Sequence, residues 1–329
     1  MKKILLIGGE GYIGRVITSY FLKLGYKVTS IDNYIYGINN YAKEISHTNY
    51  TFINTGMSNI QIIKKYIIEA DNIVLLGGLV GDPITKKYPE LSNEINNTSV
   101  KNIIDICMQV EKIKFIFIST CSNYGLIPED IKADEDYRLE PLSLYAKSKV
   151  SAENHIMSYK NKTLAIPTIL RFATAFGLSE RMRFDLTVNQ FVKELKQNEE
   201  LIVFDENTWR PYCHVVDFAR AIEAVINSDI NIINFEIFNC GSDKNNYTKK
   251  MIVDEVHRHI NKGKVIYRKN DGDPRNYRVN FQKIKSQLFF ETKYSIGDGI
   301  VEISDALDGN IFDFDSDCEF GNYKIPFNV

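Results

Sequence analysis

Residues 3–14 of this 329-residue chain have the sequence KILLIGGEGYIG, which is its strongest indication of a fold. Its apolar first part predicts a short buried β-strand, and the glycines that follow predict a tight turn into a helix. Glycine lets the backbone approach a pyrophosphate, and the N-terminus of the helix supplies N–H groups to it. The expected cofactor contacts in this turn are Gly8, Gly11, Tyr12, Ile13 and Gly14. A glycine turn of an unrelated α/β protein is the alternative.

Outward from this stretch, short β-branched runs alternate with helical patterns. We expect strands at residues 3–7, 27–31, 50–53, 72–76, 114–119 and 163–172, and helices at residues 60–69, 89–110 and 143–159. Apolar strands separated by helices predict an α/β fold, a doubly wound parallel Rossmann-type sheet of roughly seven strands.

The pattern changes after about Gly177, where strands become shorter and loops more polar. We therefore expect a dinucleotide-binding domain at residues 1–176 and a smaller α/β substrate lobe at residues 177–329. The two are expected to interleave, with part of residues 212–240 returning to the first domain. The acidic, aromatic tail from Asp313 either covers the small lobe or is partly ordered.

Composition excludes several classes of protein. Hydrophobic residues make up 44% and charged residues 25% of the chain, which is typical of a folded globular protein and not of a disordered or fibrous one. The net charge of -2, from 40 basic and 42 acidic side chains, offers no excess to neutralise a phosphate backbone. We therefore expect no nucleic-acid partner. No apolar stretch approaches the roughly 18 residues of a membrane span.

The cysteines indicate a reducing compartment, because none of them forms a Cys-x-x-Cys pair. They are Cys107, Cys121, Cys213, Cys240 and Cys318. The apolar residues 4–7 are too few for the central region of a signal peptide. We expect a cytoplasmic protein without a metal site.

Asp32 predicts the choice of cofactor. It ends the second expected strand about 20 residues after the glycines, where a carboxylate binds the ribose hydroxyls of adenosine. A carboxylate there repels a 2′-phosphate, and Asn33 and the residues after it include no compensating arginine. The sequence therefore predicts NAD rather than NADP, with Asp32 and Asn33 as ligands. A solvated aspartate at a strand end is the alternative.

Tyr145 and Lys149 lie four residues apart and share one face of an expected helix. A phenol has a pKa of about 10, and a nearby ammonium group favours the phenolate. Such a pair moves a hydroxyl proton while a hydride moves to or from a nicotinamide. The same spacing is often a plain surface pair. Here, however, Thr120 ends the fifth strand, where ligands bind in such sheets.

At these residues the chain resembles the extended short-chain dehydrogenase/reductases, and most closely their sugar-nucleotide epimerase/dehydratase group. The motifs that match occur in the family's order: Gly8-x-x-Gly11-x-x-Gly14, Asp32-Asn33, Ser119-Thr120 with Tyr124-Gly125, and Tyr145-x-x-x-Lys149.

The resemblance implies a role for each matching residue. Tyr145 is the catalytic acid or base, Lys149 holds the nicotinamide ribose, and Thr120 binds the reacting sugar hydroxyl. Leu76 and Gly77 pass under the cofactor, and Asn96 orders the site. Two departures stand out: Thr55-Gly56-Met57 replaces a Gly-Asp pair that contacts adenine, and Gly77-Gly78-Leu79 replaces a more alanine-rich loop.

The resemblance also narrows the reaction. The family's 4,6-dehydratases have Asp-Glu directly after the catalytic threonine, whereas this chain has Cys121 and Ser122, so dehydration is not expected. The expected activity is that of an NAD-dependent C4 epimerase or 4-dehydrogenase in carbohydrate biosynthesis. A nucleotide-4-keto-sugar reductase and a silent NAD-binding regulator are the alternatives; the intact Thr120, Tyr145 and Lys149 argue against the regulator.

The expected partner is a nucleotide-diphosphate sugar. The substrate ligands expected for it are Thr120, Thr174, Arg183, Asn189, Arg210 and Arg275. Arg210 and Arg275 are the best candidates for the diphosphate, because a guanidinium group binds phosphate oxygens bidentately. The alternative for each arginine is a surface salt bridge. His214, just before a helix, is expected to be structural. The family also suggests a homodimer built from the helices at residues 89–110 and 143–159.

Overall fold

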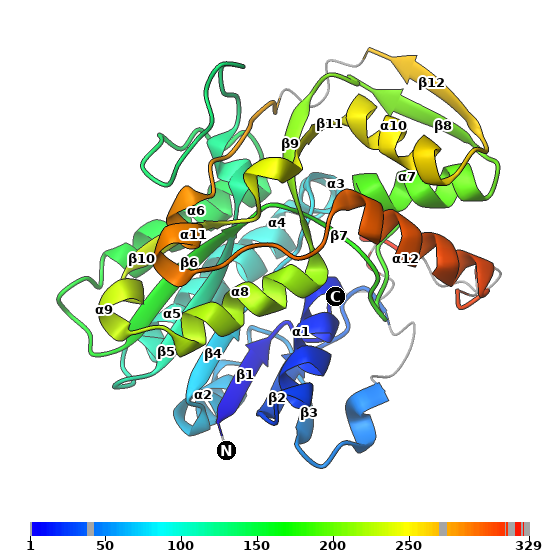
Figure 1. Ribbon diagram of the computed structural model, residues 1–329. Helices are drawn as coiled ribbons and strands as arrows, with labels where there is room; N and C mark the ends of the chain where they lie inside the picture. The colour runs from blue at the N-terminus through cyan, green and yellow to red at the C-terminus, as the bar shows by residue number, and fades with distance from the viewer. Residues whose placement is uncertain are drawn as a thin grey trace.

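The computed structural model describes residues 2–37, 43–269, 275–312, 314, 320–323 and 325. A seven-stranded parallel sheet forms its centre, in the order β10-β6-β5-β4-β1-β2-β3 (Figure 1). The strands are β1 (Lys3–Ile7), β2 (Lys27–Asp32), β3 (Tyr50–Asn54), β4 (Asn72–Leu75), β5 (Lys114–Thr120), β6 (Ile166–Phe172) and β10 (Glu236–Cys240). This confirms the doubly wound parallel sheet.

Helices cover both faces of this sheet, because nearly every residue of its inner strands is apolar and buried. One face packs against α1 (Tyr12–Lys23) and α8 (Val215–Asn227), which also contact each other. The other face packs against α2 (Ile60–Glu69), α5 (Val100–Cys107) and α6 (Leu144–Met157). Ile103, Ile104 and Cys107 belong to this second core and are fully buried within the chain.

The order of the strands reverses between β1 and β4, which makes this edge the switch point where such sheets bind ligands. Backbone hydrogen bonds join the end of β1 to both of its neighbours. Gly8 N–H donates to Ile31 O of β2 (2.8 Å), and the N–H groups of Leu76 and Gly77, just after β4, both donate to Ile7 O (2.9 and 2.8 Å). The glycine turn and the loop after β4 therefore lie side by side.

A smaller α/β part stands above the carboxyl ends of the strands (Figure 1). It contains two small sheets: β7 (Thr174–Phe176) with β9 (Trp209–His214) and β11 (Asn246–Thr248), and β8 (Glu200–Phe204) with β12 (Lys264–Arg268). Three helices share its core: α7 (Thr187–Lys196), α10 (Lys249–His259) and α12 (Ile296–Asp308). The chain returns from here to the large sheet through α8 and β10.

The helix expected at residues 89–110 consists of three pieces: α4 (Pro89–Asn93), a π-helical turn (Glu94–Ser99) and α5. A separate helix, α3 (Asp82–Lys87), precedes it and was not predicted. Widened turns of this kind are frequent at functional sites. The remaining short helices are α9 (Ile230–Ile233), α11 (Gln282–Leu288) and the 3-10 turns Lys43–Ser46, Cys121–Tyr124 and Asp243–Asn245.

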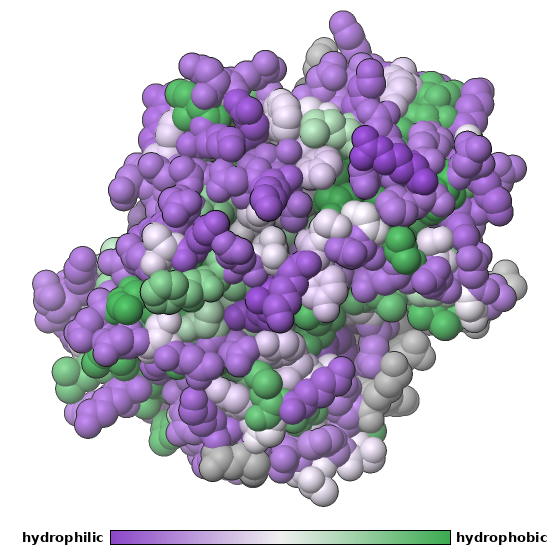
Figure 2. Space-filling model, in the orientation of Figure 1, coloured by the Kyte–Doolittle hydropathy of each residue, from purple (hydrophilic) through white to green (hydrophobic). Residues whose placement is uncertain are grey.

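The face of the molecule in Figure 2 is mostly hydrophilic, with hydrophobic side chains in small scattered patches. Within the described ranges, we find no helix with both the length and the apolar character that crossing a bilayer requires.

Candidate active site

A cavity of about 520 Å³ lies at the carboxyl ends of the central strands, under the smaller part of the molecule. Most residues predicted from the sequence meet in its wall: Gly8, Gly11, Tyr12, Ile13, Gly14, Asp32, Asn33, Leu76, Gly77, Thr120, Tyr145, Lys149, Thr174, Arg183, Arg210 and Arg275. The predicted dinucleotide site and the predicted catalytic site therefore share one cavity.

The glycine turn fits a dinucleotide pyrophosphate. Gly8 has a φ of +88°, and a Cβ atom there would lie 2.5 Å from the backbone of Gly77. A Cβ atom on Gly14 would lie 2.5 Å from Gly9 O, so this close crossing also requires glycine. Helix α1 starts after Gly11, and among the residues that the structure describes no side chain caps its first N–H groups. These N–H groups and the positive end of the helix dipole suit an anion in the cavity.

Asp32 is the last residue of β2 and is hydrogen-bonded to the glycine turn. Its two carboxylate oxygens accept hydrogen bonds from the backbone N–H groups of Glu10 (3.1 Å) and Tyr34 (2.9 Å). Burial raises the pKa of Asp32, and these two backbone hydrogen bonds oppose that rise. The carboxylate is thus fixed by the backbone and faces the cavity, as a ligand of ribose hydroxyls requires.

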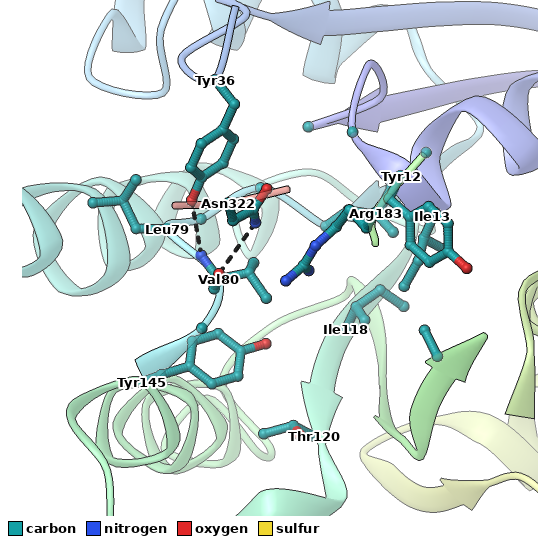
Figure 3. Close-up of a pocket in the computed structure, with 18 of the residues that line it drawn as sticks. Tyr12, Ile13, Tyr36, Leu79, Val80, Ile118, Thr120, Tyr145, Arg183 and Asn322 are labelled. Atoms are coloured by element: carbon teal, nitrogen blue, oxygen red, sulfur yellow. Dashed lines mark hydrogen bonds between the residues drawn. The ribbon is translucent and has the colours of Figure 1, made fainter. Parts of the chain in front are cut away.

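Two neighbouring elements position the catalytic candidates (Figure 3). Strand β5 ends at Thr120, whose hydroxyl oxygen accepts Ser122 N–H (3.1 Å) and caps the following turn. Helix α6 starts after Ser143, whose hydroxyl oxygen accepts Ala146 N–H (3.1 Å). Tyr145 therefore lies in the first turn of α6, and its hydroxyl and the Thr120 side chain face the same space.

Lys149 lies one turn further along α6, is 5% exposed and donates from Nζ to Ile118 O (2.8 Å). Its Nζ is 5.7 Å from the centre of the Tyr145 ring. Burial lowers the pKa of Lys149 to about 8, and the charge of Glu153 opposes this.

Arg183 influences Tyr145 as well. Burial raises the pKa of Tyr145, and the largest opposing influence is the positive charge of Arg183. The ammonium group of Lys149 is directed to the backbone carbonyl of Ile118. Arg183 thus favours the phenolate of Tyr145, and the effect expected of Lys149 stays a prediction.

A buried polar network supports the end of β5 and was missed by the sequence analysis. Glu153, one turn after Lys149, accepts hydrogen bonds from Asn123 Nδ2 (2.9 Å), from the Ser119 hydroxyl and from Arg171. The ion pair Arg171–Glu153 has an N–O distance of 2.7 Å, and both side chains are 3% exposed. The i, i+4 spacing of Lys149 and Glu153 was the signal available in the sequence.

The three arginines predicted for the substrate have different partners. Arg183 forms a bidentate pair with Asp185 (2.9 and 2.6 Å). Arg210 donates to Trp209 O (2.8 Å) and to the backbone carbonyl of Arg275. The guanidinium group of Arg275 is 2.9 Å from a carboxylate oxygen of Asp82, across the cavity wall. The residues just before Arg275, Gly272-Asp273-Pro274, lie outside the described residues.

Two predicted ligands lie behind the cavity wall rather than in it. Asn96 accepts Leu79 N–H (2.8 Å) and donates to Leu79 O (3.0 Å), so its amide is engaged by the loop after β4. Asn189 is fully buried, accepts Gly177 N–H (3.1 Å) and donates to the Tyr12 hydroxyl (3.0 Å) and to Arg183 O (2.9 Å). Asn96 therefore holds the loop after β4, as expected of a residue that orders the site, and Asn189 holds Gly177, Tyr12 and Arg183. Their assignments as cofactor and substrate ligands stay predictions.

His214 has the structural role expected of it. Its ring accepts Val216 N–H (3.3 Å) at the start of α8 and pairs with Glu302 (2.6 Å).

A wall of the cavity comes from parts of the chain that the sequence did not mark (Figure 3). The Tyr36 hydroxyl accepts Val80 N–H (3.2 Å), and Asn322 donates from Nδ2 to Val80 O (3.1 Å). Arg181 donates to Gly321 O (3.3 Å). Residues 320–323 therefore link the loop after β4 to the segment that contains Arg181 and Arg183.

Known proteins with this fold include nucleotide-sugar enzymes of several kinds. A UDP-glucuronic acid 4-epimerase from Bacillus cereus, in complex with UDP-glucuronic acid and NAD, superimposes with a TM-score of 0.84 and 23% identity over 93% of this chain and 99% of its own. A dTDP-glucose 4,6-dehydratase from Bacillus anthracis, in complex with NAD, gives a TM-score of 0.82 and 24% identity over 94% of this chain and 97% of its own. At this identity the likeness concerns the fold alone.

Sequence relatives have the same range of names. A UDP-glucuronate 4-epimerase from Thermodesulfobacterium geofontis is 26% identical over 91% of this chain and 94% of its own length. UDP-glucuronic acid decarboxylase 1 from Danio rerio is 26% identical over 70% of this chain, and the match spans 55% of that protein. Residues 4–241 match the model of one family over most of the chain. By this match, and in agreement with the resemblance drawn from its motifs, the chain belongs to the NAD dependent epimerase/dehydratase family, and its cofactor is NAD.

Proposed function

We propose that this protein oxidises the C4 carbinol of a nucleotide-diphosphate sugar, as a C4 epimerase or a 4-dehydrogenase. The observation that supports this most is one shared cavity, in which the glycine turn and Asp32 meet Thr120, Tyr145 and Lys149. The turn, Asp32, Asn33 and Lys149 would hold the cofactor. When bound, NAD supplies the acceptor and donor of a hydride.

Tyr145 acts as the acid and base in this proposal. Its phenolate takes the proton of the C4 hydroxyl while the C4 hydrogen leaves as a hydride, and the resulting phenol returns the proton when the hydride returns. Thr120 hydrogen-bonds the same sugar hydroxyl and orients it. The positive charge of Arg183 favours the phenolate form of Tyr145, against the effect of burial. The buried Glu153–Arg171 pair keeps the end of β5 in place.

The residues after Thr120 argue against dehydration. Cys121 is 1% exposed, its thiol is directed to Arg171 O (3.2 Å), and burial raises its pKa well above the ordinary value. The hydroxyl of Ser122 is 3.2 Å from that of Tyr277. Neither side chain supplies the carboxylic acid and base that eliminate water across C5 and C6.

Relatives support the substrate class, and their names include an epimerase and a decarboxylase of UDP-glucuronic acid. A nucleotide-4-keto-sugar reductase uses the same three side chains, so it stays the alternative. The arrangement of these side chains supports an active enzyme rather than a silent regulator.

The experiment is a panel of nucleotide-sugars, with UDP-glucose and UDP-glucuronic acid included, incubated with the protein and NAD. Absorbance of the reduced nicotinamide and mass spectrometry of the products are followed together. A product epimeric at C4 without net reduced cofactor indicates an epimerase, and net reduced cofactor with an oxidised sugar indicates a dehydrogenase. A product that has lost water, or the absence of turnover across the panel, would overturn the proposal.

A further inference from the structure

Glu10 is the only charged residue of the glycine turn at residues 8–14, and it is 3% exposed. Its side chain is directed toward β2 and β3. One carboxylate oxygen accepts hydrogen bonds from the hydroxyl groups of Ser30 (2.6 Å) and Tyr50 (2.5 Å). The other lies 3.0 Å from Nε of Arg15 in α1. A buried carboxylate with this many partners has a fixed position.

The position of Glu10 brings it next to Asp32. The backbone N–H of Glu10 donates to the Asp32 carboxylate (3.1 Å), and both residues line the cavity. Burial raises the pKa of Asp32, and the charge of Glu10 adds to this effect. Asp32 therefore faces the end of the cavity that is expected to hold the adenosine ribose, and the carboxylate of Glu10 lies buried behind it, bonded to Ser30 and Tyr50.

We propose that Glu10 is a second specificity-determining residue for the cofactor, which acts with Asp32 to select NAD over NADP. The inference rests on the cofactor site assigned above, but not on the identity of the sugar. A 2′-phosphate has a charge near -2 at neutral pH, and a second carboxylate next to Asp32 repels it. Ribose hydroxyls have no charge and are unaffected by this repulsion.

The carboxylate of Glu10 also forms an ion pair with Arg15. Arg15 is 4% exposed, and its guanidinium group contacts Glu10 (3.0 Å) and Glu180 (3.3 Å). An arginine beside the adenosine ribose commonly accommodates the phosphate of NADP. The carboxylates of Glu10 and Glu180 hold the guanidinium group of Arg15. A substitution that removes the charge of Glu10 leaves this group with one carboxylate partner fewer, and therefore more available to a phosphate.

Glu10→Gln is the test variant, because a glutamine keeps an acceptor oxygen for Ser30 and Tyr50 and removes only the charge. The dissociation constants of NAD and NADP are measured by calorimetry without sugar, so turnover is not needed. We expect the NADP affinity to rise roughly 10-fold, with the NAD affinity within about 3-fold of the original. Glu10→Gln combined with Asp32→Asn is expected to bind NADP more tightly than either single variant.

Glu180→Gln is the matched control, since it removes the other carboxylate that contacts Arg15. We expect it to change the ratio of NAD to NADP affinity less than Glu10→Gln does, because only Glu10→Gln also removes the charge next to Asp32, to which the Glu10 backbone N–H donates. Thermal unfolding of each variant shows whether it is folded. If Glu10→Gln changes both affinities by the same factor, Glu10 only supports the turn and the inference is wrong. If the unaltered protein binds neither cofactor, the proposed function itself fails.

Discussion

At the scale of one residue, the buried charge of Lys149 in the cavity wall lowers the stability of the folded protein. Burial lowers its pKa from 10.5 to about 8, so the folded protein disfavours the ammonium form. Since one pKa unit corresponds to about 1.4 kcal/mol, the buried charge costs on the order of 3 kcal/mol at neutral pH. The folded pKa lies below the unfolded one. The cost is therefore complete below pH ~8 and disappears as the pH rises toward ~10.5.

Lys149→Met should accordingly stabilise the protein while it removes activity. We expect the free energy of unfolding, measured in urea at pH 7, to rise by about 1–3 kcal/mol, with a smaller difference at pH 9.5. Lys147→Met, on the same helix at an exposed position, is the control and should change stability by less than about 0.5 kcal/mol. A Lys149 variant that is less stable than the original at both pH values would contradict the assigned burial cost.

Single residues also show what the sequence could predict of the site. Gly8, Asp32, Thr120 and Tyr145 follow strand ends or open a helix, so their place at one edge of a parallel sheet follows from the alternating pattern. The contacts of Asn96 and Asn189 could not be predicted, because sequence position does not tell whether an amide faces a cavity or the protein backbone. The Glu153–Arg171 pair joins α6 to β6, a contact that depends on tertiary packing.

At the scale of one element, the π-helical turn Glu94–Ser99 reaches the cavity wall through Ile95. The turn places Asn96 beside the loop after β4, where its amide bonds both the N–H and the carbonyl of Leu79. Leu79 and its neighbours Gly77 and Val80 line the cavity. Asn96 is therefore a positioning residue for this loop.

Asn96→Ala should leave the Leu79 N–H and carbonyl buried without partners. We expect a loss of about 1–3 kcal/mol in stability and a clearly weaker affinity for NAD, because the loop after β4 loses its support. Asn97→Ala is the control in the same turn, since the side chain of Asn97 donates to that of Asn93 (2.8 Å) at the surface. If the two variants lose the same stability and bind NAD equally well, Asn96 does not position the loop.

Helices and strands were predicted well where the apolar pattern of neighbouring residues determines them. The helix at residues 60–69 has the predicted bounds, and the strands end within a few residues of them. Helix α3 was missed because it is short and begins with Asp82-Pro83, which resembles a loop. The π-helical turn has no sequence signal, because it differs from an α-helix only in its hydrogen bonds.

At the scale of the whole molecule, an ion pair in the cavity wall joins two segments that lie far apart in the sequence. Asp82 opens α3, whereas Arg275 belongs to the segment after β12, whose residues Tyr277 and Val279 pack in the core of the large sheet. Arg275 was expected to bind the substrate diphosphate. Its pairing with Asp82 means that a diphosphate would compete with this carboxylate for one guanidinium group.

Arg275→Ala should weaken nucleotide-sugar binding roughly 10- to 1,000-fold, because a charge-assisted pair in a desolvated cleft is lost. NAD affinity should change little, since the glycine turn and Asp32 are unaffected. Asp82→Asn, which keeps the shape and removes the competing charge, should bind the nucleotide-sugar several-fold more tightly. Titration of each variant with cofactor and sugar separately checks this. Equal weakening of both ligands by Arg275→Ala would mean that Arg275 supports folding only.

We propose that the C4 hydrogen of the sugar is transferred to NAD as a hydride while Tyr145 takes the hydroxyl proton. The fate of this C4 hydrogen is the most direct test. The measurement is a single turnover of the active nucleotide-sugar with deuterium at C4, followed by mass spectrometry of cofactor and sugar. We predict a several-fold slower turnover than with hydrogen, with the deuterium on the reduced nicotinamide if the protein is a dehydrogenase and returned to C4 of the product if it is an epimerase. Neither effect is expected in Tyr145→Phe, which still binds both ligands. Product formed at equal rates from both isotopic forms, with no deuterium on the nicotinamide, would contradict the account.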